Sequence, residues 1–219
     1  MDSSSEGLSF KYTMVTCGHS GMRSVDGLKR FEEAARRYLP NPLRLLFIAE
    51  APPAFKVNRL FYFTGLRDGD TLFLEMMKVL YPAEVGYSEG AFRPGFSAKQ
   101  MRLRKQELLR KFQNDGYHLI DAYEQPMPDG ANAATKTVLM RSTLPAHQSK
   151  VRRLLRKRSV PLILIGGITY SVCADVLRAD GYKVVNGAMI HHPARGGQKL
   201  FRAELREVLI DIDRFGRNV

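Results

Sequence analysis

The stretch Leu43-Arg44-Leu45-Leu46-Phe47-Ile48-Ala49 decides the fold, because it is short, almost wholly apolar and followed by Pro52 and Pro53. This pattern is typical of a strand in a sheet that is covered on both faces. Three further short apolar segments lie downstream, at 117–123, 161–165 and 182–185. The sequence therefore predicts a sheet of about four strands.

Segments with helical periodicity alternate with these predicted strands. One of these helices begins at a capping box formed by Ser97 and Gln100 and ends at Gly116. The others are predicted at 25–38, 71–81, 146–158, 169–179 and 198–215. Residues 82–96 and 124–134 are predicted loops. Alternation of this kind favours parallel strands with helices on both faces. We predict an α/β fold, a three-layer α/β/α sandwich around a mostly parallel sheet.

Length and composition fit a single folded domain. The chain has 219 residues, of which 44% are hydrophobic and 26% are charged, enough apolar surface for a sizeable core. We expect a Ser- and Gly-rich N-terminal arm at 1–22 and one domain at 23–219. No apolar run approaches the roughly 20 residues that cross a bilayer, and the start lacks a signal peptide's layout. We expect a cytoplasmic monomer without a membrane partner.

Cysteine and histidine are too sparse for a predicted metal centre. Cys17 and Cys173 cannot supply a disulfide framework, a four-cysteine zinc site or an iron–sulfur cluster. The pair His191-His192 has no further ligands at suitable spacing. Gly166-Gly167 could bring backbone N–H groups to a phosphate, but it lacks the spacing of a dinucleotide-binding loop. We expect no metal, no iron–sulfur cluster and no other cofactor.

The chain is strongly basic, with 34 Lys and Arg against 22 Asp and Glu, a net charge of +12 and an isoelectric point near 9.9. One dense run holds Lys150, Arg152, Arg153, Arg156, Lys157 and Arg158, and a second group holds Arg102, Arg104, Lys105, Arg110 and Lys111. A solvated helix face explains a single run. Two runs favour contact with phosphates, so DNA, single- or double-stranded, is the predicted partner.

Polar side chains follow the predicted strands where ligands bind to an open parallel sheet, outside the carboxyl ends. Glu50 comes directly after the first strand, where partial burial would raise its pKa; it could instead cap a turn. Asp121 stands inside an apolar run, where a charge is costly unless something uses it. A buried hydrogen-bonding role explains Asp121 equally well.

Five segments, taken in chain order, resemble the motifs of the uracil-DNA glycosylase superfamily. Phe47-Ile48-Ala49-Glu50-Ala51-Pro52-Pro53 looks like its Gly-Glu-Ala-Pro-Gly motif, Phe61-Tyr62-Phe63-Thr64-Gly65 like its Arg-Pro-Phe-Val-Gly segment, and Leu119-Ile120-Asp121-Ala122-Tyr123 takes the place of its Asn-bearing strand. Leu162-Ile163-Leu164-Ile165-Gly166 matches its late strand and Gly, and His192-Pro193-Ala194 looks like its His-Pro-Ser motif. The likeness spans position 43 to the C-terminus.

The resemblance implies a hydrolase that flips a uracil or other damaged base out of DNA and cleaves its N-glycosidic bond. Phe63 would lie against the base, while a backbone amide beside Ala51 and the side chain of Asp121 would contact its edge. His192 would stabilise the negative charge that develops on the leaving base.

The sequence departs from the family pattern at several of these positions. The superfamily's water-activating Asp is replaced by Ala51, so the general base would have to be Glu50 or Asp121. Asp121 also replaces the Asn that reads uracil, and Arg195 is the one candidate wedge after the His-Pro motif. Two other functions stay open: a catalytically inactive glycosylase-like protein that binds nucleic acid, and a hydrolase of free nucleosides or other small molecules.

Overall fold

The computed structural model describes residues 21–54, 60–66, 68–155, 157–194 and 196–216. Its centre is a parallel sheet with the strand order β4 (Tyr117–Asp121), β1 (Leu45–Ala49), β5 (Pro161–Leu164) and β6 (Lys183–Val184). Because β1 lies between two parallel neighbours, its edges and both of its faces are covered, and all five of its residues are buried. The predicted parallel sheet of about four strands is confirmed.

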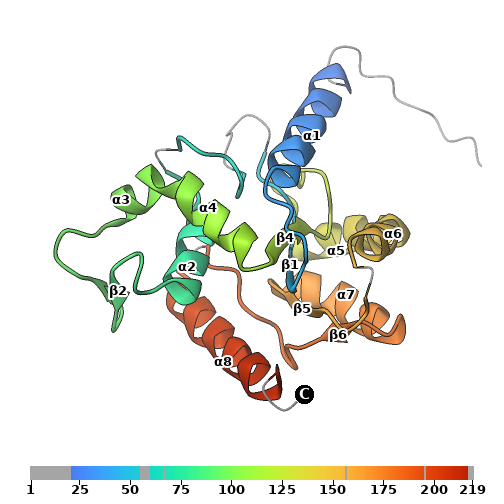
Figure 1. Cartoon of the computed structure of the whole chain (residues 1–219). Coiled ribbons are helices and arrows are strands. Elements are labelled where there is room, and N and C mark those ends of the chain that lie inside the picture. Colours follow the sequence, from blue (N-terminus) through green and yellow to red (C-terminus); the bar gives the residue numbers. More distant parts are fainter. Residues whose placement is uncertain (1–20, 55–59, 67, 156, 195, 217–219) are drawn as a thin grey trace, which may run out of the picture.

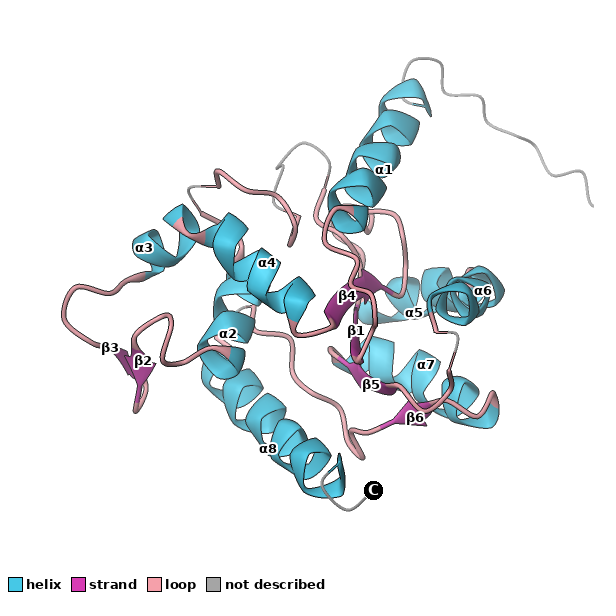
Figure 2. Cartoon of the chain, viewed as in Figure 1, coloured by secondary structure: helices cyan, strands magenta, loops and turns pink. Residues whose placement is uncertain are grey.

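Helices cover both faces of the sheet, which makes the fold an α/β sandwich (Figures 1 and 2). Alternate side chains of β1 point to opposite faces, as in any strand. Phe47 belongs to the core shared with α1 (Gly21–Arg36), α2 (Thr71–Leu80), α4 (Lys105–Asn114) and α8 (Gln198–Gly216). Ile48 belongs to the core shared with α5 (Ala133–Ser142), α6 (Leu144–Leu154) and α7 (Gly167–Ala179).

Several predicted elements have different bounds in the structure. The helix predicted after Ser97 is two helices, α3 (Ala98–Leu103) and α4, because the backbone of Arg104 leaves the helical region, with ψ near 14°. The predicted loop at 82–96 holds a small antiparallel pair, β2 (Tyr87–Ser88) and β3 (Ala91–Phe92). Glu89 and Gly90 turn this hairpin with positive φ angles of 51° and 88°.

Other differences concern the ends of the chain and the surface. Helix α1 begins at Gly21, two residues before the predicted domain boundary, and α6 ends at Leu154 instead of position 158. Helix α5 was not predicted, because Met140 is its one fully buried residue and its remaining positions give little apolar periodicity. Within the described ranges, no helix is both long and apolar enough to cross a membrane.

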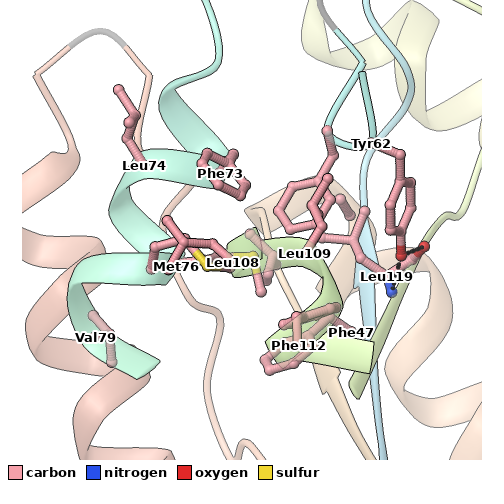
Figure 3. Close-up of a cluster of buried hydrophobic side chains, with 14 of the residues drawn as sticks. Phe47, Tyr62, Phe73, Leu74, Met76, Val79, Leu108, Leu109, Phe112 and Leu119 are labelled. Atoms are coloured by element: carbon pink, nitrogen blue, oxygen red, sulfur yellow. Dashed lines mark hydrogen bonds between the residues drawn. The ribbon is translucent and has the colours of Figure 1, made fainter. Parts of the chain in front are cut away.

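Phe47 of β1 belongs to the larger core, where it lies beside Phe112 (Figure 3). Its ring is fully buried and lies 5.8 Å from the ring centre of Phe112 and 6.2 Å from that of Tyr117. Replacing this ring by a methyl group removes buried apolar area and leaves a cavity between sheet and helices.

We expect Phe47→Ala to lower the free energy of unfolding by about 3–5 kcal/mol, measured by urea denaturation. Leu103→Ala is the matched control, because Leu103 on α3 is 72% exposed and should change stability by less than about 0.5 kcal/mol. Equal losses for the two variants would contradict this position of the core.

Candidate active site

The sheet register brings three segments to one edge. Ala49 pairs with Asp121 at the last position of β1 and β4, and the N–H groups of Ala122 and Tyr123 donate to Ala49 and Glu50 at 2.8 and 3.0 Å. The N–H of Gly166, after β5, donates to the carbonyl of Ile190 at 2.7 Å. The chain that leaves Ile190 toward His192 therefore starts at the same carboxyl edge.

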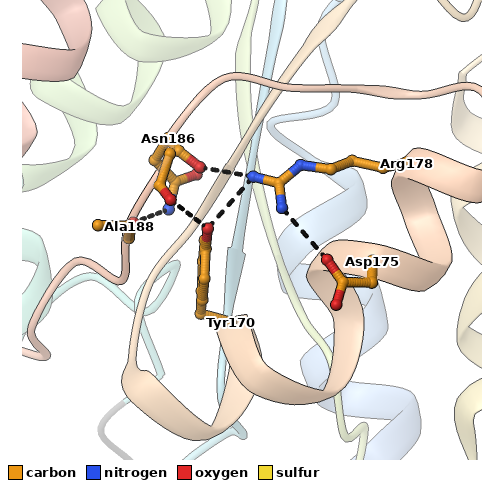
Figure 4. Close-up of polar contacts among 6 residues, drawn as sticks. Tyr170, Asp175, Arg178, Asn186 and Ala188 are labelled. Carbon is orange, nitrogen blue, oxygen red and sulfur yellow. Dashed lines mark hydrogen bonds and ion pairs between the residues drawn. The ribbon is translucent and has the colours of Figure 1, made fainter.

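A polar network fixes this last segment (Figure 4). The buried Asn186 side chain accepts from the N–H of Leu164 at 3.0 Å and donates to the carbonyls of Leu164 and Ala188. Arg178 of α7 donates to the Asn186 carbonyl at 2.9 Å and to the Tyr170 hydroxyl at 3.2 Å. Asn186 thus ties the loop before His192 to β5, a role that the sequence analysis missed.

These segments surround a cavity of about 260 Å³. Its lining includes Ala51, Phe61, Asp121 and His192, together with the start of α2. The structure therefore brings three of the predicted site residues, Ala51, Asp121 and His192, to one hollow.

The start of α2 is held in place by a buried ion pair at the cavity wall. Asp70, whose side chain is fully buried, accepts from Arg102 at 2.8 Å and from Lys105 at 3.3 Å. Burial of Lys105 lowers its pKa to about 8, against the opposing effect of Asp70. Lys105 also lies 4.3 Å above the ring of Phe73, which lines the cavity. This ion pair orients the cavity wall.

Phe63, the ring assigned to the base by resemblance, does not line the cavity. It lies edge-on to Phe31 of α1 at 5.5 Å, with the guanidinium of Arg30 at 5.0 Å from its ring centre. Phe61 lines the cavity instead and packs edge-on to Phe73 at 5.6 Å. In a run of three aromatic residues, sequence spacing cannot tell which ring faces inward.

Asp121 lines the cavity with a carboxyl group that no described residue neutralises. It is half-buried, and its carboxyl group has no hydrogen bond or ion pair with any residue in the described ranges. Burial raises its pKa to about 7; the charge of Lys150 lowers it and that of Glu124 raises it. Near neutral pH the side chain can therefore serve as donor or acceptor.

His192 also lines the cavity, and its residue is exposed to solvent. Its Nδ1 accepts from the N–H of Ala194 at 3.2 Å, which leaves Nε2 as the protonated nitrogen of the neutral ring. Surrounding protein atoms lower its pKa, the Glu50 charge raises it and the Lys136 charge lowers it. A neutral Nε2–H donor is thus present at pH 7.

His191 points to a different partner. Its Nδ1 lies 2.7 Å from one carboxylate oxygen of Glu204 on α8, and its N–H donates to the other oxygen at 2.7 Å. The pair anchors the loop and leaves His192 as the histidine of the cavity.

Glu50 is held outside the cavity lining. Its carboxylate accepts from the ammonium of Lys136 on α5 at 2.6 Å. The sequence analysis missed Lys136 together with its helix, although Asn132 is a visible N-cap that accepts from the N–H of Thr135. From this position the Glu50 charge acts on His192. Of the two carboxyl groups that line the cavity, Asp70 is paired with Arg102 and Lys105, which leaves Asp121 for a ligand.

The basic runs are less available than the sequence suggested. Lys150 is paired with Glu124 at 2.7 Å, while Arg152 and Arg153 are exposed on α6. The second group is used within the protein: Arg102 and Lys105 bind Asp70, Arg104 binds Glu107, Lys111 binds Glu84 and Asp115, and Arg110 binds the Arg37 carbonyl. Two basic groups were expected to contact phosphates. The structure leaves one of them, on α6, with exposed arginines that no described residue pairs.

Two predicted DNA contacts, Arg156 and Arg195, lie outside the described residues. In the part of the chain that the structure covers, no three His, Cys, Asp or Glu side chains gather closely enough to hold a metal ion. Comparison with protein-family models, with curated proteins and with solved structures gives no match to this chain.

The raised pKa of Asp121 makes stability depend on pH in a defined direction. The folded state holds the proton up to about pH 7, whereas the unfolded chain releases it near pH 3.8. This group's contribution to stability is full below pH 3.8 and is lost as the pH rises through about 7.

We expect the near-isosteric Asp121→Asn to be more stable than the wild type at pH 8, with a difference that shrinks toward pH 4, measured by urea denaturation at each pH. Glu89→Gln, on the exposed hairpin turn, is the control without such a trend. A difference that does not vary with pH would contradict the raised pKa.

Proposed function

We propose that this chain is a hydrolase that excises a base from DNA by cleaving the N-glycosidic bond, as uracil-DNA glycosylases do. The observation that carries the proposal is the single cavity that Ala51, Phe61, Asp121 and His192 line from four separate segments. It joins an aromatic ring, a carboxyl group and a neutral imidazole donor, which suit a flat heterocycle with a polar edge.

Asp121 would read the edge of the flipped base. In its protonated form the carboxyl group presents a donor beside an acceptor, as the amide of Asn does, and so matches the N–H and carbonyl of uracil or hypoxanthine. As a carboxylate it presents acceptors alone and suits a base with two adjacent N–H donors. The pKa of about 7 places both forms within reach of neutral pH.

His192 would assist departure of the base. When the bond from the sugar carbon to the base nitrogen breaks, its electron pair goes to the base, and negative charge gathers on a carbonyl oxygen. The Nε2–H of His192 would donate to that oxygen. Water then attacks the sugar carbon, and its proton passes to the departed base or to solvent.

An excision assay tests the proposal. Oligonucleotides carrying uracil, hypoxanthine, xanthine or hydroxymethyluracil are incubated with the protein at pH 6 and pH 8, and alkali-labile abasic sites are counted. Cleavage of at least one substrate is the expected result. DNA binding with every substrate uncut would identify a nucleic-acid-binding protein without catalysis, and cleavage of free nucleosides alone would identify a small-molecule hydrolase.

We expect His192→Ala to lower the excision rate by about 10² to 10³ while binding to undamaged DNA stays nearly unchanged, because one transition-state donor is lost. Single-turnover kinetics on the substrate that is cut measure the effect. Val138→Ala, exposed on α5, is the control and should keep the wild-type rate. A wild-type rate in His192→Ala would place the site elsewhere.

The exposed arginines of α6 supply the proposed contact with DNA phosphates. We expect the double substitution of Arg152 and Arg153 by Ala to weaken binding to all DNA sequences. It should also flatten the plot of log affinity against log salt by up to about 0.9 for each lost duplex contact. Arg141→Ala, exposed on α5, is the control. An unchanged slope would show that the two arginines make no contact with DNA phosphates and are simply solvent-exposed.

A further inference from the structure

A second histidine stands next to the candidate site and has no part in it so far. His191 directly precedes His192, and its side chain is 41% exposed, but it does not line the base cavity. Its backbone is fixed, because the carbonyl of the buried Ile190 accepts from the N–H of Gly166 at 2.7 Å. Gly197, just before α8, lies so close that a Cβ there would be 2.6 Å from the His192 carbonyl oxygen. The start of α8 is therefore packed against this loop.

Glu204 of α8 binds two groups of His191. One carboxylate oxygen accepts from the backbone N–H at 2.7 Å, and the other lies 2.7 Å from Nδ1. Because a carboxylate only accepts hydrogen bonds, Nδ1 carries the proton, and the neutral ring has its lone pair on Nε2. Among the described residues, no other group bonds to Nε2 or to Glu204. An imidazole with an open lone pair, oriented by a carboxylate, is the arrangement of a general base.

The two neighbouring histidines thus present opposite groups. Nδ1 of His192 accepts from the N–H of Ala194 at 3.2 Å, so its Nε2 is a donor. Nε2 of His191 is an acceptor. Hydrolysis needs both kinds of group, a donor for the leaving base and an acceptor for the proton of the attacking water.

The proposed excision step has no other assigned acceptor for that proton. Glu50 is paired with Lys136 at 2.6 Å and lies outside the cavity lining. Asp121 is assigned to the edge of the base. When a flipped base occupies the cavity, its sugar remains part of the DNA strand, so the group that activates water need not line the cavity.

We propose that His191 is the general base of this reaction and that Glu204 is its positioning residue; this role rests on the base-excision function. Nε2 of His191 takes a proton from water as the water oxygen bonds to the sugar carbon. The electron pair of the broken bond leaves with the base, whose negative charge His192 stabilises. Glu204 stabilises the positive charge that forms on the His191 ring, and the proton then passes to the departed base or to solvent.

The variant His191→Asn separates this role from that of an anchor. The amide N–H of Asn takes the place of Nδ1–H and keeps a donor for Glu204, but the amide is not a base. We expect the single-turnover rate of base release to fall by about 10² to 10⁴, with the Kd for DNA and the unfolding temperature near their wild-type values. Glu204→Gln should also lower the rate, and Glu207→Gln, exposed on the same helix, is the control.

Added azide gives a readout that an anchor would not change. Azide attacks the sugar carbon without a proton to lose, so it should restore release of the free base, measured by chromatography, in His191→Asn. It should not restore release in His192→Ala, which lacks the donor to the leaving base. Sodium chloride at the same concentration is the control for the effect of salt on DNA binding.

The outcomes separate this role from base excision itself. A wild-type rate in His191→Asn, or a lowered rate that azide does not restore, would make the pair with Glu204 an anchor alone and overturn the role of general base. Base excision would stand in that case, because the wild type and His192→Ala are measured in the same experiment. A wild type that releases no base from any substrate would overturn the excision function and this role with it.

Discussion

Burial of β1 on all sides is the constraint on which the rest of the structure depends. Its five residues fill both cores, and its parallel neighbours pair Ala49 with Asp121 on one side and Ile48 with Leu164 on the other. Because register in a two-sided buried sheet cannot slip without exposing apolar side chains, the ends of the strands are fixed to within a residue. The first residues of the loops that follow these strands are therefore fixed in position as well.

The candidate site follows from polar groups placed on this rigid edge. Asp121 carries an unpaired carboxyl group at the end of β4, and burial holds its proton to about pH 7. His192 lines the same cavity and follows a loop that is held by Asn186 and by the pair of His191 with Glu204. A half-buried carboxyl group without a hydrogen bond to the described residues, in the same cavity as an oriented imidazole, is the pattern on which the proposed ligand site rests.

The sequence predicted the parts of the fold that rest on strong local patterns, and the four strands and the parallel sheet are confirmed. Helix α5 was not predicted because little of it is buried. Lys136 on this helix, the partner of Glu50, was missed for the same reason. The choice of Phe63 over Phe61 shows the limit within an aromatic run, where tertiary packing alone decides which ring faces the cavity. Arg102 and Lys105 looked free because their partner, Asp70, lies far away in sequence.

The central claim is that the ends of β1 and β4 and the loop before α8 form one base-binding cavity. The most direct measurement is a nuclear magnetic resonance titration of the isotopically labelled protein with free uracil, hypoxanthine and xanthine. The account predicts that at least one base shifts the backbone signals of Ala51, Phe61, Asp121 and His192 together. Saturation with a base that shifts none of these four, or shifts that gather on another face, would contradict it.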